Sequence, residues 1–130
     1  MNLSLTSAEH VARARGDLRM GVPVVLRHGA TTFLVAAAET LTAQRFAELK
    51  QMGQPVVAIT RHRADTLKAR AYDGDIARIA VAPEMSVDWI RSLADPADDL
   101  NAPMKGPFHS HREGSADPHR AAIALVKTAR

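Results

Sequence analysis

The spacing of apolar positions changes along the chain, from the period of a helix to that of a strand and back. These changes predict where the helices and strands lie. In the first segment, Thr6 and Glu9 form a capping box, in which each side chain accepts from the backbone amide of the other. Apolar residues then recur at helical spacing as far as Leu18, and Gly21 supplies a stop. This segment is therefore expected to be a helix.

Two short apolar runs follow, Pro23 to Leu26 and Thr31 to Ala37, separated by the turn residues at 28–30. Runs joined by so short a turn predict an antiparallel hairpin. A third run, Pro55 to Ile59, is uninterrupted, which is typical of a strand in a sheet covered on both faces. Ile76 to Val81 alternates enough to be a fourth strand.

Four further helices are expected from residues that favour helix starts. Thr42, Thr60 and Ser86 carry hydroxyls that accept from the free amides of a first turn. Asp117 is expected to cap the last helix, with Pro118 at its first position. The order of elements predicts a layered α/β (α+β) domain, with helices packed on a mixed sheet.

Composition restricts the class of protein. The chain has 130 residues, which fits a single domain over 1–130, and its 46% hydrophobic content is enough for a core. It has no cysteine, which excludes disulfides, thiolate metal sites and a cysteine nucleophile, and suits the cytoplasm. No run is long and apolar enough for a membrane span, and the first residues lack the pattern of a secretion signal. We therefore expect a cytoplasmic protein without a membrane partner.

The net charge of the chain is only slightly positive. Seventeen Lys and Arg residues stand against 14 Asp and Glu, and the formal net charge is +3. The arginines are spread along the chain, whereas nucleic-acid binding needs a clustered basic face. No nucleic-acid partner is expected. The segment 95–106 is rich in proline and aspartate and is expected to be a loop.

Three stretches in this order resemble the 3,4-dihydroxy-2-butanone 4-phosphate synthase family. The first runs from Asp17 to the apolar segment LVAAAE, which ends at Glu39; the second is VVAITRHRADTL within 53–67; the third joins GPF at 106–108 to HRAA at 119–122. The likeness is strongest to the degenerate domain that precedes GTP cyclohydrolase II in some riboflavin biosynthesis proteins. Residues 121–130 keep a helical character to the end, so we expect the chain to be the N-terminal part of a longer parent protein.

One departure from this family bears on activity. Active synthases carry an acidic loop between the first strand and the Ala-Ala-Glu run, and it supplies metal ligands and acid–base groups. The corresponding interval here, Arg27 to Phe33, contains no carboxylate. Rearrangement of a ketopentose phosphate requires repeated enolisation, which needs proton-transfer groups and a divalent metal held by oxygen ligands. We therefore expect no catalytic residue and no cofactor in this chain.

The resemblance implies a shortened synthase-like fold and a non-catalytic, pseudoenzyme role in riboflavin biosynthesis. That role would be structural, dimerising or regulatory, with a homodimer and a fused or associated cyclohydrolase domain as partners. A surplus of large apolar residues at Phe33, Trp89, Ile90 and Leu93 supports self-association. Trp89 is expected in the core or at an interface. The alternative is a small-molecule or metal-binding protein, or an enzyme, that reuses the region of His109, His111 and His119.

These histidines are the candidate metal ligands. His109-Ser110-His111 can place both imidazoles on one side of a strand, and His119 could add a third nitrogen ligand to a zinc site. The other interpretation is a solvated loop that leads into a capped helix and holds no metal.

Two pairs of basic residues are candidates for anion binding. Arg27 and His28 lie beside two threonines at the hairpin turn, where they could hold a phosphate or only be solvated. Arg61 and Arg63 open a helix, where free amides attract anions but basic side chains oppose the helix dipole. That conflict indicates either a bound anion or a neighbouring acidic surface.

Overall fold

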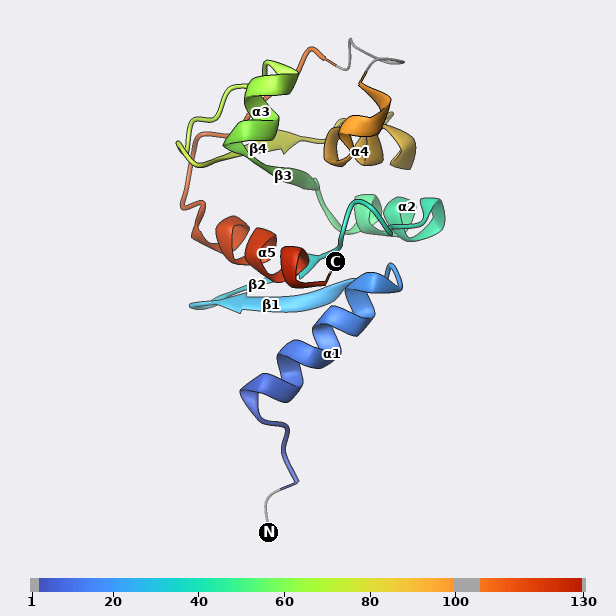
Figure 1. Ribbon diagram of the computed structural model, residues 1–130, viewed down its shortest axis with the longest axis vertical. Coiled ribbons are helices and arrows are strands. Elements are labelled where there is room, and N and C mark those ends of the chain that lie inside the picture. The colour runs from blue at the N-terminus through green and yellow to red at the C-terminus, as the bar shows by residue number, and fades with distance from the viewer. Residues whose placement is uncertain (1–2, 100–105, 130) are drawn as a thin grey trace.

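The computed structural model describes residues 3–99 and 106–129, and places helices in layers with short antiparallel strands (Figure 1). This arrangement confirms the expected α+β class. In chain order the elements are α1 (Ser7–Arg19), β1 (Val24–His28), β2 (Thr31–Val35), α2 (Ala43–Met52), β3 (Val56–Thr60), α3 (Arg61–Leu67), β4 (Ile76–Ala80), α4 (Val87–Ala94), a 3-10 turn η1 (Pro96–Asp98) and α5 (Asp117–Thr128).

The strands form two separate antiparallel pairs, in place of the single mixed sheet expected from sequence. β1 pairs with β2, with Val24 opposite Val35, and β3 pairs with β4, with Val56 opposite Ala80. The predicted hairpin is thereby confirmed. The uninterrupted apolar run of β3 has a simple reason, because α5 packs against this strand and α3 and α4 also contact it. Such covering does not require parallel neighbours.

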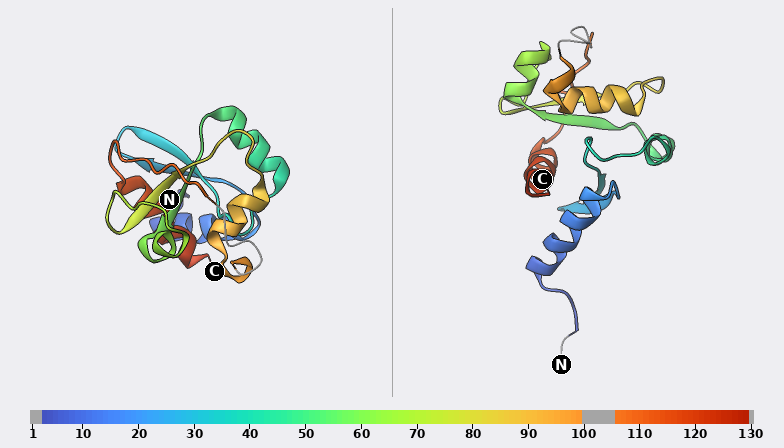
Figure 2. Two further views of the ribbon diagram at one scale, coloured as in Figure 1. Left: turned by 90° about the horizontal axis from the view of Figure 1, so that it is seen from above. Right: turned by 45° about the vertical axis from the view of Figure 1, so that its right-hand side comes forward.

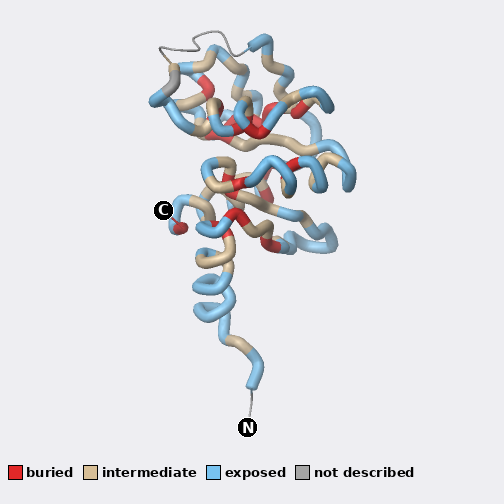
Figure 3. The backbone as a smooth tube through the Cα atoms, turned by 90° about the vertical axis from the view of Figure 1, so that its right-hand side faces the viewer, coloured by how far each residue is buried: buried red, intermediate tan, exposed pale blue. Residues whose placement is uncertain are grey.

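The layers follow one another along the long axis of the molecule. Helix α5 lies between the two sheets, while α3 and α4 lie on the far side of the β3–β4 sheet (Figures 1 and 2). Helix α1 contacts β1 and α5 only through its C-terminal part and projects away from the body. The residues at 6–13 are all exposed, as the pale tube of Figure 3 shows.

Three clusters of buried residues hold these layers together. One lies around Phe46 and Ile90 between α2 and α4, and a second lies around Ile79 and Leu93 between the β3–β4 sheet and its helices. The third surrounds Leu18, which is fully buried against residues of β1 and α5. Leu18 therefore anchors the projecting helix α1.

Most predicted helix boundaries are confirmed by the caps. The Thr6–Glu9 capping box is present, and Thr42, Thr60 and Ser86 each accept from an amide of the first turn. After α1, Gly21 has φ 77, and an added Cβ there would collide with a backbone carbonyl oxygen.

Two boundaries differ from expectation. Asp117 is the first residue of α5 and does not cap it, because Ala116 occupies the cap position and the Asp117 amide donates to the Ser115 hydroxyl at 3.2 Å. The helical spacing of Ala64, Leu67 and Ala71 predicts a helix that reaches Ala71, but α3 ends at Leu67, where Lys68 adopts the left-handed conformation with φ 60. Part of the expected 95–106 loop, residues 100–105, lies outside the described residues.

The surplus of apolar residues lies at other positions than those expected. Ile90 is 4% exposed and Leu93 is fully buried inside the chain, so neither is available for self-association. Phe33 and Trp89 are half-buried. Large apolar side chains that are exposed are Leu3, Val11, Met20, Val25, Leu34, Met52 and Tyr72. Among the described residues, no helix combines the length and apolar character that crossing a membrane requires.

Candidate functional site

The tip of the β1–β2 hairpin is basic and exposed. β1 ends at His28 and β2 begins at Thr31, with Gly29 at φ 61 in the turn. Arg27 and His28 are both exposed, and no carboxylate lies between Arg27 and Phe33. Magnesium requires hard oxygen ligands, and these side chains do not fit that ion.

The His109 segment runs beside β4 as a short extended stretch. The Ala80 amide donates to the His109 carbonyl at 2.8 Å, and the His111 amide donates to the Arg78 carbonyl at 2.6 Å. The side chains of His109 and His111 are exposed, while the Ser110 hydroxyl between them is buried and has no described partner. Because alternate residues of an extended chain share one side, the two imidazoles lie on the outer side.

His119 lies apart from this pair, in the first turn of α5. Its ring meets the ring of Phe33 edge-on, with centroids 6.1 Å apart, and its Nδ1 atom is buried without a described partner. Within residues 3–99 and 106–129, no three histidine, aspartate or glutamate side chains are grouped so that they could hold a metal ion. The candidate zinc arrangement of His109, His111 and His119 therefore has no counterpart among the described residues.

The environment of His119 favours its neutral form. Burial is the main cause that lowers the pKa of His119, and the charge of Arg78 lowers it further. Asp73 acts in the opposite direction, and His111 adds a small lowering effect. The imidazole therefore lies neutral against Phe33 at neutral pH.

Acidification should destabilise the protein through His119. An unfolded histidine titrates near pH 6.5, so below that value the unfolded chain binds a proton that folded His119 resists. The contribution of His119 to stability is therefore fully present above about pH 6.5. It is lost as the pH falls toward the lower pKa that His119 has in the folded protein. Urea unfolding at about pH 7.5 and 5.5 should show a smaller pH dependence for His119→Gln than for wild type. The exposed His62→Gln variant is the control, and an equal change in both variants would contradict the assignment.

A network of hydrogen bonds and ion pairs, which we did not predict from the sequence, connects the 73–75 turn to β4 and α5. Arg78 is 4% exposed, and its guanidinium donates to both carboxylate oxygens of Asp73 at 2.8 and 3.1 Å. Arg120 of α5 donates to Asp75 and Asp117, and these hydrogen bonds raise the pKa of Arg120. The bond from Arg120 is also the main reason why the pKa of Asp75 is lowered. An arginine inside the apolar strand IARIA was the available signal, because a buried guanidinium requires a partner.

Arg61 and Arg63 face acidic partners. Arg63 donates to both carboxylate oxygens of Asp99 at 2.6 and 2.8 Å and to two carbonyl oxygens of α4. The hydrogen bond to Asp99 is the main cause that raises the pKa of Arg63. Arg61 is exposed and lies 3.8 Å from Asp65 one turn along. An acidic neighbour, which was one of the two explanations for basic residues in this first turn, is therefore present beside Arg63.

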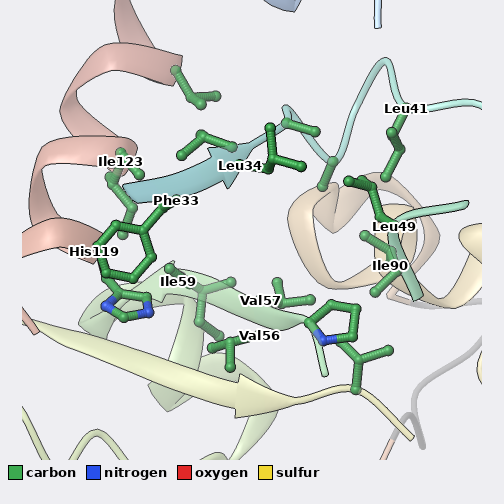
Figure 4. Close-up of a pocket in the computed structure, with 18 of the residues that line it drawn as sticks. Phe33, Leu34, Leu41, Leu49, Val56, Val57, Ile59, Ile90, His119 and Ile123 are labelled. Carbon is green, nitrogen blue, oxygen red and sulfur yellow. The ribbon is translucent and has the colours of Figure 1, made fainter. Parts of the chain in front are cut away.

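An apolar pocket with a volume of about 970 Å³ lies between the two sheets (Figure 4). Its walls come from β2, β3, α2 and α5, and its apolar lining includes Leu34, Val57 and Ile123. Phe33 and His119 lie together at one end (Figure 4). The volume is within the range of small-molecule pockets.

The protein is thus a small α+β domain with an apolar pocket between its two strand pairs. No family model matches the chain, and neither the curated proteins nor the solved structures contain a match to it.

Proposed function

We propose that this chain is a non-catalytic, synthase-like domain that dimerises and supports a GTP cyclohydrolase II-type protein of riboflavin biosynthesis. The proposal is supported by three stretches that resemble the family in order: the opening helix and first strand with the LVAAAE run, the VVAITRHRADTL segment, and GPF followed by HRAA. Helices and antiparallel strands occupy the corresponding segments. The cyclohydrolase would be fused to the chain or associated with it.

The observation that carries the non-catalytic role is the hairpin tip. Its exposed residues from Arg27 to Thr32 are basic, small or hydroxylated, and none is a carboxylate that could act as a magnesium ligand. Enolisation at a sugar phosphate needs a base and a way to stabilise the enediolate beside the substrate. His28 could accept a proton, but the tip has no carboxylate to hold the metal that would stabilise the enediolate.

The dimerising role is supported by exposed apolar surface. Val25 and Leu34 are cross-strand neighbours on the β1–β2 hairpin, and they are 67% and 45% exposed. Small domains bury a limited fraction of their surface, and closed two-fold dimers are the commonest oligomers. Covering such residues by a second copy would remove apolar area from water.

Sedimentation velocity on the purified chain tests the dimer. At micromolar concentration we expect a species with twice the mass of one chain, in a concentration-dependent equilibrium with the monomer. A single species with the mass of one chain at every concentration up to about 100 µM would contradict the dimerising role.

A further inference from the structure

The pocket between the sheets has two chemically different ends. Its walls come from β2, β3, α2 and α5 of one chain, and its volume is about 970 Å³. Figure 4 shows Phe33 and His119 together at one end of the pocket, and Leu41, Leu49 and Ile90 at the other. The pocket therefore has one aromatic end, which carries an imidazole, and one aliphatic end.

The aliphatic end of the pocket is formed by the core of the protein. Leu41 and Ile90 are each 4% exposed and belong to the buried cluster around Phe46, and Leu49 and Val57 pack against that cluster. Water finds few hydrogen-bond partners along such walls, so a water-filled pocket with this lining is unfavourable. An apolar molecule in the pocket would remove this apolar surface from water.

The imidazole of His119 is the polar group at the aromatic end. Its ring meets the ring of Phe33 edge-on, and its Nδ1 atom is buried without a described partner. Within residues 3–99 and 106–129, neither ring nitrogen of His119 forms a hydrogen bond with another residue. Buried polar groups normally have a partner, and a neutral imidazole offers one donor and one acceptor. A bound molecule with a hydrogen-bonding group would supply such a partner.

The charges around the pocket favour a neutral occupant. The charged residues of the described lining are Glu39, Arg63 and Lys127. The guanidinium of Arg63 is already held by Asp99 through two hydrogen bonds, and Glu39 and Lys127 are exposed. His119 is neutral at neutral pH, because burial lowers its pKa. An ionised group is costly to bury without a partner, so an ionised ligand would be disfavoured inside the pocket.

We propose that this pocket binds a neutral, largely apolar small molecule, whose hydrogen-bonding group lies beside His119 and whose apolar part lies against Leu49 and Val57. Apolar walls with a few polar groups are typical of small-molecule sites, and the volume is within their range. The ligand site goes beyond the proposed structural role and does not require a dimer. Leu34 belongs both to the pocket lining and to the exposed hairpin surface, so the variants that test the site leave Leu34 unchanged.

A matched pair of fluorescent probes tests the class of ligand. N-phenyl-1-naphthylamine is neutral and apolar and has one N–H group, and 8-anilino-1-naphthalenesulfonate has the same scaffold with an added sulfonate. Both probes fluoresce more strongly in apolar surroundings. The wild-type chain should bind the neutral probe saturably, with a Kd below about 100 µM. It should bind the sulfonate at least about 10-fold more weakly, because the pocket would bury that charge without a partner.

Two tryptophan substitutions on α5 test where the neutral probe binds. Ile123→Trp places a larger side chain in the pocket lining and should weaken binding at least about 10-fold. Ala124→Trp is the matched control, because residue 124 is exposed and does not line the pocket. It should change the affinity by less than about twofold. His119→Leu keeps an apolar wall and removes the hydrogen bond, so binding should weaken about 5-fold.

The outcomes distinguish the ligand site from the dimer. The ligand site is overturned if the wild type does not bind the neutral probe saturably, or if Ile123→Trp and Ala124→Trp bind it equally while urea unfolding shows both to be folded. Should Ile123→Trp not fold, an unchanged affinity in His119→Leu overturns the site. Equal affinities of the wild type for the two probes overturn the neutral class of ligand.

Sedimentation velocity on the same samples reports the dimer separately. A monomer that binds the neutral probe contradicts the dimerising role and leaves the ligand site intact. A dimer that does not bind the probe contradicts the ligand site and leaves the dimerising role intact.

Discussion

Replacing Arg78 with methionine is expected to lower the free energy of unfolding by about 3 kcal/mol or more. Arg78 is 4% exposed, and its two hydrogen bonds to Asp73 are accompanied by a third, longer one to the Gly114 carbonyl at 3.4 Å. Methionine retains much of the apolar stem but leaves the Asp73 carboxylate buried without its partner. Most of the decrease in the free energy of unfolding should therefore come from the Asp73 carboxylate that is left without a partner.

A second variant distinguishes the loss of the Arg78–Asp73 ion pair from the cost of leaving the Asp73 charge without a partner. In Arg78→Met with Asp73→Asn, the uncompensated charge is removed together with the ion pair, so part of the stability should return. Arg120→Met is the matched surface control. Its ion pairs with Asp75 and Asp117 lie on the surface, where solvent screens them, so this variant should lose clearly less stability than Arg78→Met. Urea unfolding at neutral pH measures all three. Equal losses in Arg78→Met and Arg120→Met would contradict a structural role for the buried pair.

Local chemistry predicted the elements well because caps and turns act over a few residues. The Thr6–Glu9 pair, the hydroxyls of Thr42 and Ser86, and the short 28–30 turn each depend on neighbours in sequence. Asp117 was misplaced by one position, because the helix begins one residue earlier than expected and the Arg120 amide donates to the Ala116 carbonyl.

Long-range pairing was not predictable in the same way. The apolar run of β3 indicates that both faces are covered, but it does not distinguish a parallel neighbour from the antiparallel β4 that the structure contains. Burial of Ile90 and Leu93 likewise depends on where α4 lies, so their apolar character alone gave the wrong surface for self-association.

The candidate site was only partly predictable, because a side chain's partner can be distant in sequence. Arg63 and Asp99 are 36 positions apart, and helical position alone allowed either an anion or an acidic neighbour. The exposed hairpin tip followed directly from the sequence, because the short turn leaves its residues no room to be buried. The pocket between the sheets had no sequence signal, since it arises from how the two strand pairs are arranged.

The loss of catalysis is the central claim, and turnover of ribulose 5-phosphate in the presence of magnesium tests it most directly. The purified chain should form no 3,4-dihydroxy-2-butanone 4-phosphate and release no formate above a blank, because the tip from Arg27 to Phe33 carries no carboxylate. An Arg27→Ala, His28→Ala variant, prepared identically, controls for trace enzyme from the host. Turnover clearly above the blank, abolished by a chelator and lost in that variant, would contradict the claim.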